Sequence, residues 1–206
     1  MPTALEPITL SRRERTAVIT LTSADGTNIL GISVIRALLE SFGRLRREAE
    51  TGQIKSVIIT GNERFFSAGA DLNEISRLTG PEAYKLSRLG QRLMNLIDSF
   101  PVPVIAAIRG YCMGGGMDLA LACDYRIAAP NAVFGHRGAS LGLITGWGGT
   151  QRLPRLIGKP RALQMFLLAE KVNAKEALQI GLVGCVSNDP VSDAVRFARP
   201  SHSHLT

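Results

Sequence analysis

Aromatic side chains are scarce in this sequence: Phe, Trp and Tyr make up 5% of its 206 residues. They are not interleaved with the arginines and lysines that give the chain a formal net charge of +7. Proteins that bind single-stranded nucleic acid combine a basic groove with aromatic rings on which the bases stack. The composition therefore disfavours nucleic acid as a partner. The cluster of Arg44, Arg46 and Arg47 leaves RNA binding as a distant alternative.

Cysteine is equally sparse and occurs only as Cys112, Cys123 and Cys185. These residues lack the spacing of metal ligands or of a disulfide framework, so we expect small core residues in a reducing compartment. Of the three histidines, His136 lies inside an ordered motif, whereas the other two belong to a Ser/His-rich tail. We therefore predict no metal site.

No stretch of about 18 consecutive apolar residues occurs, which is the length that a membrane-spanning helix requires. The most hydrophobic region, residues 102–123, is interrupted by Arg109 and Asp118. The N-terminal segment lacks the apolar core of a secretory signal peptide and carries Glu6 and Glu14 among its arginines. We therefore expect a cytoplasmic protein without membrane contact. Its 45% of hydrophobic residues are enough for one sizeable core.

Strand-like and helix-like patterns alternate along the chain, which predicts an α/β fold. No linker-like composition precedes residue 188, so we predict one core domain over residues 1–187. Residues 188–206 are expected to form a shortened or disordered C-terminal tail. The predicted strands are residues 17–22, 57–60, 104–108, 124–129, 132–134 and 182–187, and the clearest predicted helices are residues 32–49, 82–98, 162–168 and 174–180.

Two glycine-containing segments carry the chemical signal. Residues 65–72 read FFSAGADL, and residues 111–123 read YCMGGGMDLALAC, after a predicted strand in each case. A strand that runs through glycines into a helix presents free backbone N–H groups at the positive end of that helix. Glycine also lets a ligand approach the backbone without a Cβ in the way. Two such turns that converge on one oxygen would form an oxyanion hole.

The two segments are followed by Gly142-Leu143 and by GWGGTQRLPRLIG at residues 146–158. In this order they resemble the enoyl-CoA hydratase/isomerase family, the crotonase superfamily, over residues 16–186. The resemblance implies a crotonase-like spiral of repeated ββα units, assembled as a homotrimer or homohexamer. It implies an acyl-CoA thioester substrate, with coenzyme A as part of the substrate and no separate cofactor, and a role in fatty-acid metabolism such as β-oxidation. Family members continue beyond the match to Val186, so we expect a C-terminally truncated version.

The resemblance also assigns site residues. Ala68 and Gly115 match the positions whose backbone N–H groups form the oxyanion hole. The loop that contacts the substrate, together with Gly115, corresponds to Ala68, Gly69, Ala70, Asp71 and Leu72. Asp118 matches the first catalytic carboxylate of the hydratases and is expected to act as a general acid/base. As an alternative, its carboxylate only stabilises a helix N-terminus.

Two further positions depart from the hydratase pattern, in addition to Asp118, which stands where the hydratases carry their first catalytic glutamate. Gly138 stands where the second catalytic glutamate is expected, and Gly146 stands where some family members carry a catalytic aspartate. Loss of a general acid/base group typically removes about 100- to 10,000-fold in rate. Hydratase activity is therefore in question, and a catalytically impaired acyl-CoA-binding protein is the second hypothesis.

Overall fold

The computed structural model describes residues 6–198. Its larger sheet has six strands in the order β1-β2-β4-β7-β9-β12. The first pair is antiparallel and the others are parallel, so the middle strands are buried on both faces. The strands are β1 (Ile8–Arg13), β2 (Thr16–Leu21), β4 (Ser56–Thr60), β7 (Val104–Ile108), β9 (Tyr125–Ala128) and β12 (Cys185–Val186).

A four-stranded sheet in the order β11-β10-β8-β5 lies beside the first, and β3 pairs with β6. Successive pairs of strands are each followed by a helix, as in β7-β8-α4 and β9-β10-α5. This repetition is the predicted spiral of ββα units, and the α/β class is confirmed. The strands are β3 (Ile29–Leu30), β5 (Phe65–Ser67), β6 (Gly69–Ala70), β8 (Tyr111–Met113), β10 (Val133–Gly135) and β11 (Lys171–Asn173).

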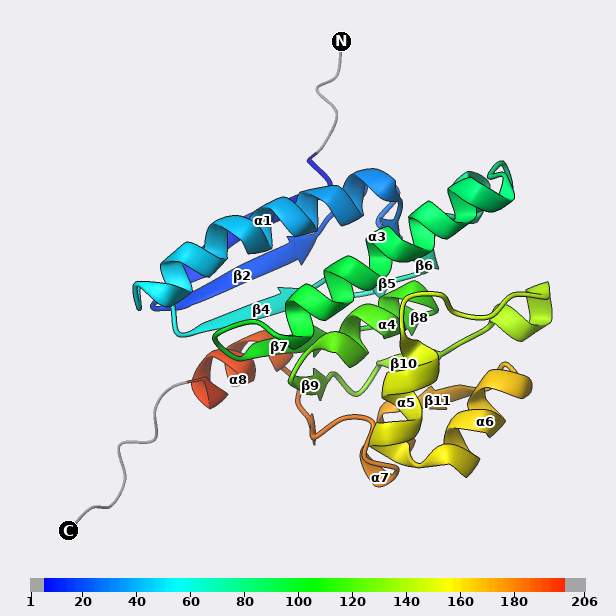
Figure 1. Ribbon diagram of the computed structural model, residues 1–206. Coiled ribbons are helices and arrows are strands. Elements are labelled where there is room, and N and C mark those ends of the chain that lie inside the picture. Colours follow the sequence, from blue (N-terminus) through cyan, green and yellow to red (C-terminus); the bar gives the residue numbers. More distant parts are fainter. Residues whose placement is uncertain (1–5, 199–206) are drawn as a thin grey trace.

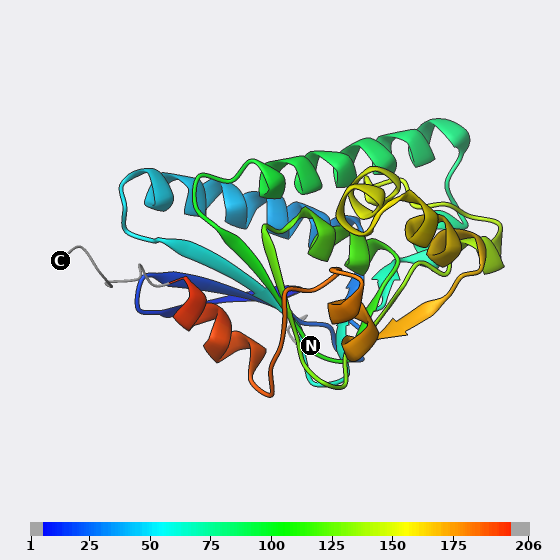
Figure 2. The same ribbon diagram turned by 90° about the horizontal axis from the view of Figure 1, so that it is seen from below.

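The helices are distributed over both faces of the larger sheet. Figures 1 and 2 show α1 and α3 side by side on one face and α8 on the other. Alternate strand residues point to opposite faces, so Val57 and Ile59 join the main core while Ile58 contacts the α8 side. The helices are α1 (Ile32–Glu50), α2 (Leu72–Ile75), α3 (Gly80–Asp98), α4 (Gly115–Ala122), α5 (Gly149–Ile157), α6 (Lys159–Leu167), α7 (Ala174–Gln179) and α8 (Pro190–Phe197), with a 3₁₀ turn η1 (Gly138–Leu141).

Helix α4 is central to this arrangement. Every one of its residues is buried, including Asp118, because α3, α5 and the short strands surround it. A helix that is apolar on all sides must lie in the interior of a protein. The carboxyl end of α4 is held by Arg126, whose guanidinium donates hydrogen bonds to the carbonyl oxygens of Ala120 (3.3 Å), Cys123 (2.7 Å) and Leu182 (2.9 Å).

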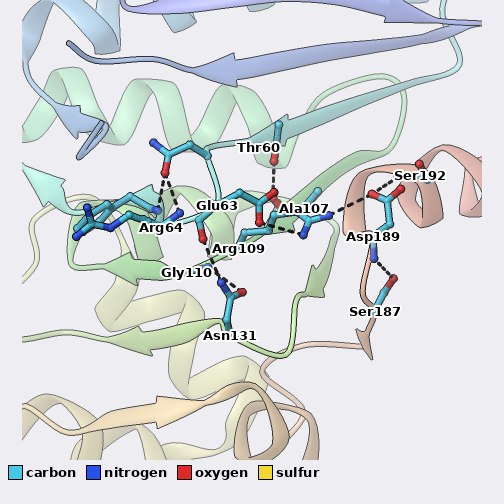
Figure 3. A network of polar contacts seen from close by, with 12 residues as sticks. Thr60, Glu63, Arg64, Ala107, Arg109, Gly110, Asn131, Ser187, Asp189 and Ser192 are labelled. Atoms are coloured by element: carbon cyan, nitrogen blue, oxygen red, sulfur yellow. Dashed lines mark hydrogen bonds and ion pairs between the residues drawn. The ribbon is translucent and has the colours of Figure 1, made fainter. Parts of the chain in front are cut away.

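The tail at residues 188–206 was expected to be shortened or disordered, and disorder does not apply to residues 190–197, which form α8. Ala194 and Val195 of this helix are buried against the sheet. Asp189 accepts a hydrogen bond from the Ser192 amide at 3.3 Å and so caps the helix N-terminus. Arg109 lies between Glu63 (3.3 Å) and Asp189 (3.4 Å) and connects the helix to the end of β7 (Figure 3). The Ser/His segment after residue 198 lies outside the described residues.

The predicted strand at residues 182–187 is shorter than expected. The amides of Leu182 and Val183 both donate to the carbonyl of Ala177, at 2.8 and 3.2 Å, and this closes the end of α7. Only Cys185–Val186 pairs with β9. Several short strands were not predicted, since two or three residues carry too little periodicity. The six-residue strand β1 was also missed, because only Ile8 of its residues is buried and its apolar alternation is short. Within residues 6–198, no helix has the length and apolar character needed to cross a membrane.

Candidate active site

The amino end of α4 carries the amide of Gly115, one of the two predicted backbone donors. Gly114 has a φ of +50°, and α4 begins at Gly115, whose amide precedes the first turn of helical hydrogen bonds. A Cβ on Gly115 would lie 2.3 Å from the Trp147 ring and 3.2 Å from the Ala70 nitrogen. A Cβ on Gly116 would lie 2.6 Å from the Cβ of Ser67. The glycines therefore allow the two predicted loops to approach each other closely, as the sequence indicated.

Ala68 does not provide the second donor. Its N–H group donates a 2.9 Å hydrogen bond to the carbonyl of Thr27, so it is already engaged within the fold. The neighbouring Ser67 hydroxyl fixes the turn, because it accepts from the Gly69 amide at 3.1 Å and donates to the Asn28 carbonyl at 2.7 Å. The expectation of a free Ala68 amide is contradicted. The amide nitrogen of Ala70 is the one that lies close to Gly115.

A cavity of about 830 Å³ opens beside this helix end. Its lining is mainly apolar and includes Ala68, Gly69, Ala70, Leu72 and Gly115. Asp71, the remaining residue of the predicted binding loop, is not part of the lining. Its carboxylate instead accepts hydrogen bonds from the amides of residues 73 and 74, at 2.8 and 3.0 Å, and caps α2.

Asp118 is buried beside the same cavity, with 1% of its surface exposed. The Thr145 hydroxyl donates to its Oδ2 atom, and the Nε2 atom of His136 lies 3.4 Å from its Oδ1 atom. Burial raises the pKa of Asp118 to about 7, although the Thr145 hydroxyl, the charge of Arg152 and nearby backbone amides lower it. Burial also lowers the pKa of His136 to about 4. Burial thus shifts the protonation equilibrium of both groups toward the neutral form.

The two glycine positions add no acid or base to the cavity. A Cβ on Gly138 would lie 2.5 Å from the carbonyl oxygen of Leu143, so the turn there has no room for a side chain. Gly146 contributes its carbonyl, which accepts hydrogen bonds from the Ser87 hydroxyl (3.0 Å) and the Gln91 amide (2.9 Å). Among the described residues that line the cavity, Asp118 is the only carboxylate.

Two residues near Asp118 were not predicted as partners. His136 was placed in an ordered motif but given no role, and Thr145 had no motif of its own. Neither spacing nor composition indicates that these side chains meet α4, because the contact depends on how β10 and the loop before α5 fold back. Trp147, 5% exposed, packs on Gly90 and Gly115, in line with its expected place as a core or cavity-wall residue.

The fold and this cavity define a class: an α/β spiral of ββα units in which backbone amides and one buried carboxylate meet beside an apolar cavity. A family model described as enoyl-CoA hydratase/isomerase matches residues 11–199. The chain belongs to the enoyl-CoA hydratase/isomerase family, as its motifs indicated.

Individual relatives agree with this assignment. The chain is 46% identical over 154 residues to a probable enoyl-CoA hydratase of Bacillus subtilis (strain 168), which covers 74% of this chain and 60% of the relative. It is 41% identical over 184 residues to a crotonyl-CoA hydratase of Syntrophomonas wolfei, covering 89% and 70%. The crystal structure of an enoyl-CoA hydratase from Bacillus anthracis aligns with a TM-score of 0.88 at 35% identity, covering 93% and 75%. The chain thus spans 60 to 70% of the length of these two sequence relatives.

Proposed function

We propose that this chain binds an acyl-CoA thioester in the cavity and stabilises the enolate of that thioester, with Asp118 as the general acid/base. The observation that carries the proposal is the position of Asp118, a single buried carboxylate beside the amino end of α4. The family membership and the crotonyl-CoA hydratase among the relatives support an enoyl-CoA as substrate.

The thioester oxygen would accept hydrogen bonds from the amides of Gly115 and Ala70. Ala70 replaces Ala68 in this role because the Ala68 amide already donates to Thr27. Each donor aimed at a developing oxyanion contributes on the order of 3 kcal/mol to the stability of the transition state. The positive end of the α4 dipole acts in the same direction.

Asp118 would take a proton from a carbon of the bound thioester and return it to another carbon. A pKa of about 7 keeps comparable amounts of the carboxylate and the carboxylic acid at neutral pH, which suits a group that must both accept and donate a proton. One carboxylate is enough to move a proton along an enolate. The usual hydratase arrangement, in which two carboxylates orient a water molecule, would lack its second member at Gly138. We therefore propose isomerase-type proton transfer over efficient hydration.

The test compares the wild-type chain with Asp118→Asn, using crotonyl-CoA for hydration and a 3-enoyl-CoA for isomerisation. We expect turnover of at least one substrate by the wild type, and a loss of about 100- to 10,000-fold in the variant. Asp98→Asn is the control, since that carboxylate is 61% exposed at the end of α3. Equal rates in wild type and Asp118→Asn would remove Asp118 from the mechanism.

The second candidate is an acyl-CoA-binding protein without turnover, which the glycines at positions 138 and 146 favour. Micromolar binding of an acyl-CoA by calorimetry, with no conversion of any thioester, would support it over the enzyme.

Homotrimeric or homohexameric assembly remains a further proposal. It is supported by exposed apolar side chains around the cavity mouth, such as Ile144 and Leu167 at 73% and 71% exposure, and analytical ultracentrifugation would test it.

A further inference from the structure

Two buried polar atoms of the site lie close together, and neither has a hydrogen-bond partner. They are the Oδ1 atom of Asp118 and the Nε2 atom of His136, which lie 3.4 Å apart on side chains that are 1% and 4% exposed. Only four buried side-chain atoms within residues 6–198 lack a partner, and these are two of them. Buried polar groups are normally hydrogen-bonded, so two such atoms at this separation point to a proton between them.

The described side chains that line the cavity around the pair include no second carboxylate or imidazole that could take this proton. On Asp118, the Oδ2 atom is occupied by the Thr145 hydroxyl. The charge of Arg152 reaches the carboxylate from α5, but its guanidinium is directed to Asn95 (3.0 Å) and to a carboxylate of α3. The thiol of Cys112, from β8, is held neutral because burial raises its pKa. On the other side of the imidazole lies the ring of Phe166, 4.9 Å away between centroids.

The fold also keeps space open for the pair. A Cβ on Gly149, the first residue of α5, would lie 2.1 Å from Oδ1 of Asp118 and 3.0 Å from Nε2 of His136. Any other residue would therefore push between the two groups or displace them. The absence of a side chain at this position permits the direct approach of carboxyl and imidazole.

We propose that Asp118 and His136 share one exchangeable proton, and that His136 acts as the proton partner of Asp118 during enolate formation. With the proton on Oδ1, the carboxyl group donates to Nε2. With the proton on Nε2, the imidazolium donates to the carboxylate, and the net charge of the pair is the same. In either arrangement both unpartnered atoms gain a hydrogen bond. The inference rests on the function proposed above, because it gives His136 a role in that reaction.

A C–H bond of the thioester breaks, its electron pair remains as the enolate, and the proton forms an O–H bond with the Asp118 carboxylate. This O–H group donates to Nε2 of His136. Transfer of the proton to Nε2 forms an imidazolium and restores the carboxylate, and it is the minor arrangement of the pair because the pKa of about 7 for Asp118 and about 4 for His136 favours the proton on Asp118. Return by the same route delivers the proton to a different carbon of the enolate. His136 thus acts through Asp118 as a positioning residue that stores the proton, in a cavity whose described lining offers no second carboxylate.

The test is an NMR titration of the full chain labelled with ¹⁵N-histidine and ¹³C-aspartate. The His136 signals are assigned as those missing from His136→Gln. In the wild type, we expect the ring nitrogens of His136 and the carboxyl carbon of Asp118 to show the same pair of titration midpoints, as coupled groups do. In Asp118→Asn, the His136 midpoint is expected to fall by at least one pH unit, a tenfold change in proton affinity. Independent single midpoints in the wild type would overturn the proposal, whatever the result for Asp118→Asn.

A kinetic measurement adds a readout that a structural role would not move. His136→Gln keeps a hydrogen-bond donor near Oδ1 but cannot titrate, so kcat is expected to fall about 10- to 100-fold with little change in KM. Its pH–rate profile should lose one of the two midpoints seen by NMR, and an unchanged profile would contradict the proton-partner role. The NMR titration is independent of turnover. Failure of the proposed function appears as no conversion of thioester, whereas failure of the pair appears as uncoupled titration.

Discussion

Two aspartates of this molecule sit in opposite surroundings. Asp118 lies in the interior against His136, and burial raises its pKa to about 7. Asp189 lies at the surface between α8 and Arg109, 54% exposed, and there the hydrogen bond from Ser192 lowers the pKa of the carboxyl (Figure 3). The same functional group is thus shifted toward its neutral form in one place and kept charged as a helix cap in the other. Solvent access, rather than the number of polar neighbours, separates the two roles.

The largest expected effect comes from filling the space beside the buried carboxylate. Gly149→Ala places a methyl group 2.1 Å from Oδ1 of Asp118, and we expect a loss of about 3 kcal/mol in the free energy of unfolding. Urea denaturation measures it. Gly43→Ala is the matched control, since Gly43 is an exposed position of α1 where a Cβ would meet open space. Helix propensity predicts a gain of about 1 kcal/mol in its free energy of unfolding. An unchanged free energy of unfolding in Gly149→Ala would show that Asp118 and His136 tolerate separation by a methyl group.

The next effect compares a buried arginine with a surface one. Arg126→Met leaves three carbonyl oxygens at the end of α4 and beyond it without their donor. We expect a loss of about 2 kcal/mol, because buried acceptors lose hydrogen bonds that water does not replace. Chemical denaturation of this variant beside Arg109→Met gives the difference directly. Equal losses would contradict the distinction between interior and surface.

The pH dependence of the free energy of unfolding should distinguish the contribution of Asp118 from that of His136. Asp118 keeps in the folded state a proton that the unfolded chain releases near pH 4, so its contribution to stability falls as the pH rises from about 4 to 7. His136 has the opposite effect, because it binds a proton near pH 6.5 in the unfolded chain but only near pH 4 in the folded state. Its contribution to stability therefore rises with pH between about 4 and 6.5. Between these limits the two slopes oppose each other in the wild type.

Single variants remove this cancellation. As the pH rises from 4.5 to 6.5, the free energy of unfolding of Asp118→Asn is expected to increase by about 1 kcal/mol per pH unit. Over the same range, the free energy of unfolding of His136→Gln is expected to decrease by about the same amount. Urea denaturation at three pH values in that window is sufficient. Parallel profiles for the two variants would rule out opposite protonation behaviour.

The smallest effect belongs to the surface network. Arg109→Met removes the contacts to Glu63 and Asp189, whose side chains are 76% and 54% exposed. We expect a loss below about 1 kcal/mol, which shrinks in 1 M NaCl because salt screens exposed charges. Turnover should stay at the wild-type level. A larger or salt-independent loss would indicate that this network holds α8 by more than surface electrostatics.

Local patterns predicted much of the fold. The strand at residues 104–108 is β7 with the same bounds, and the amphipathic stripe of residues 32–49 became α1, with Leu38 and Phe42 fully buried. These elements are long enough for their periodicity to be distinct. The helix α8 was missed because its eight residues precede a polar tail, and its apolar face, which includes Val195, is satisfied only by the sheet.

The sequence by itself determined the family, the alternation of strands and helices, the glycine-lined start of α4 at Gly115 and the carboxylate at Asp118. These features are encoded in consecutive residues, because backbone conformation and helix ends depend on near neighbours. Only the tertiary structure decided that the Ala68 amide is engaged by Thr27 and that His136 lies against Asp118. Hydrogen-bond partners and burial are set by segments that are distant along the chain, so protonation and donor identity follow from the folded core alone.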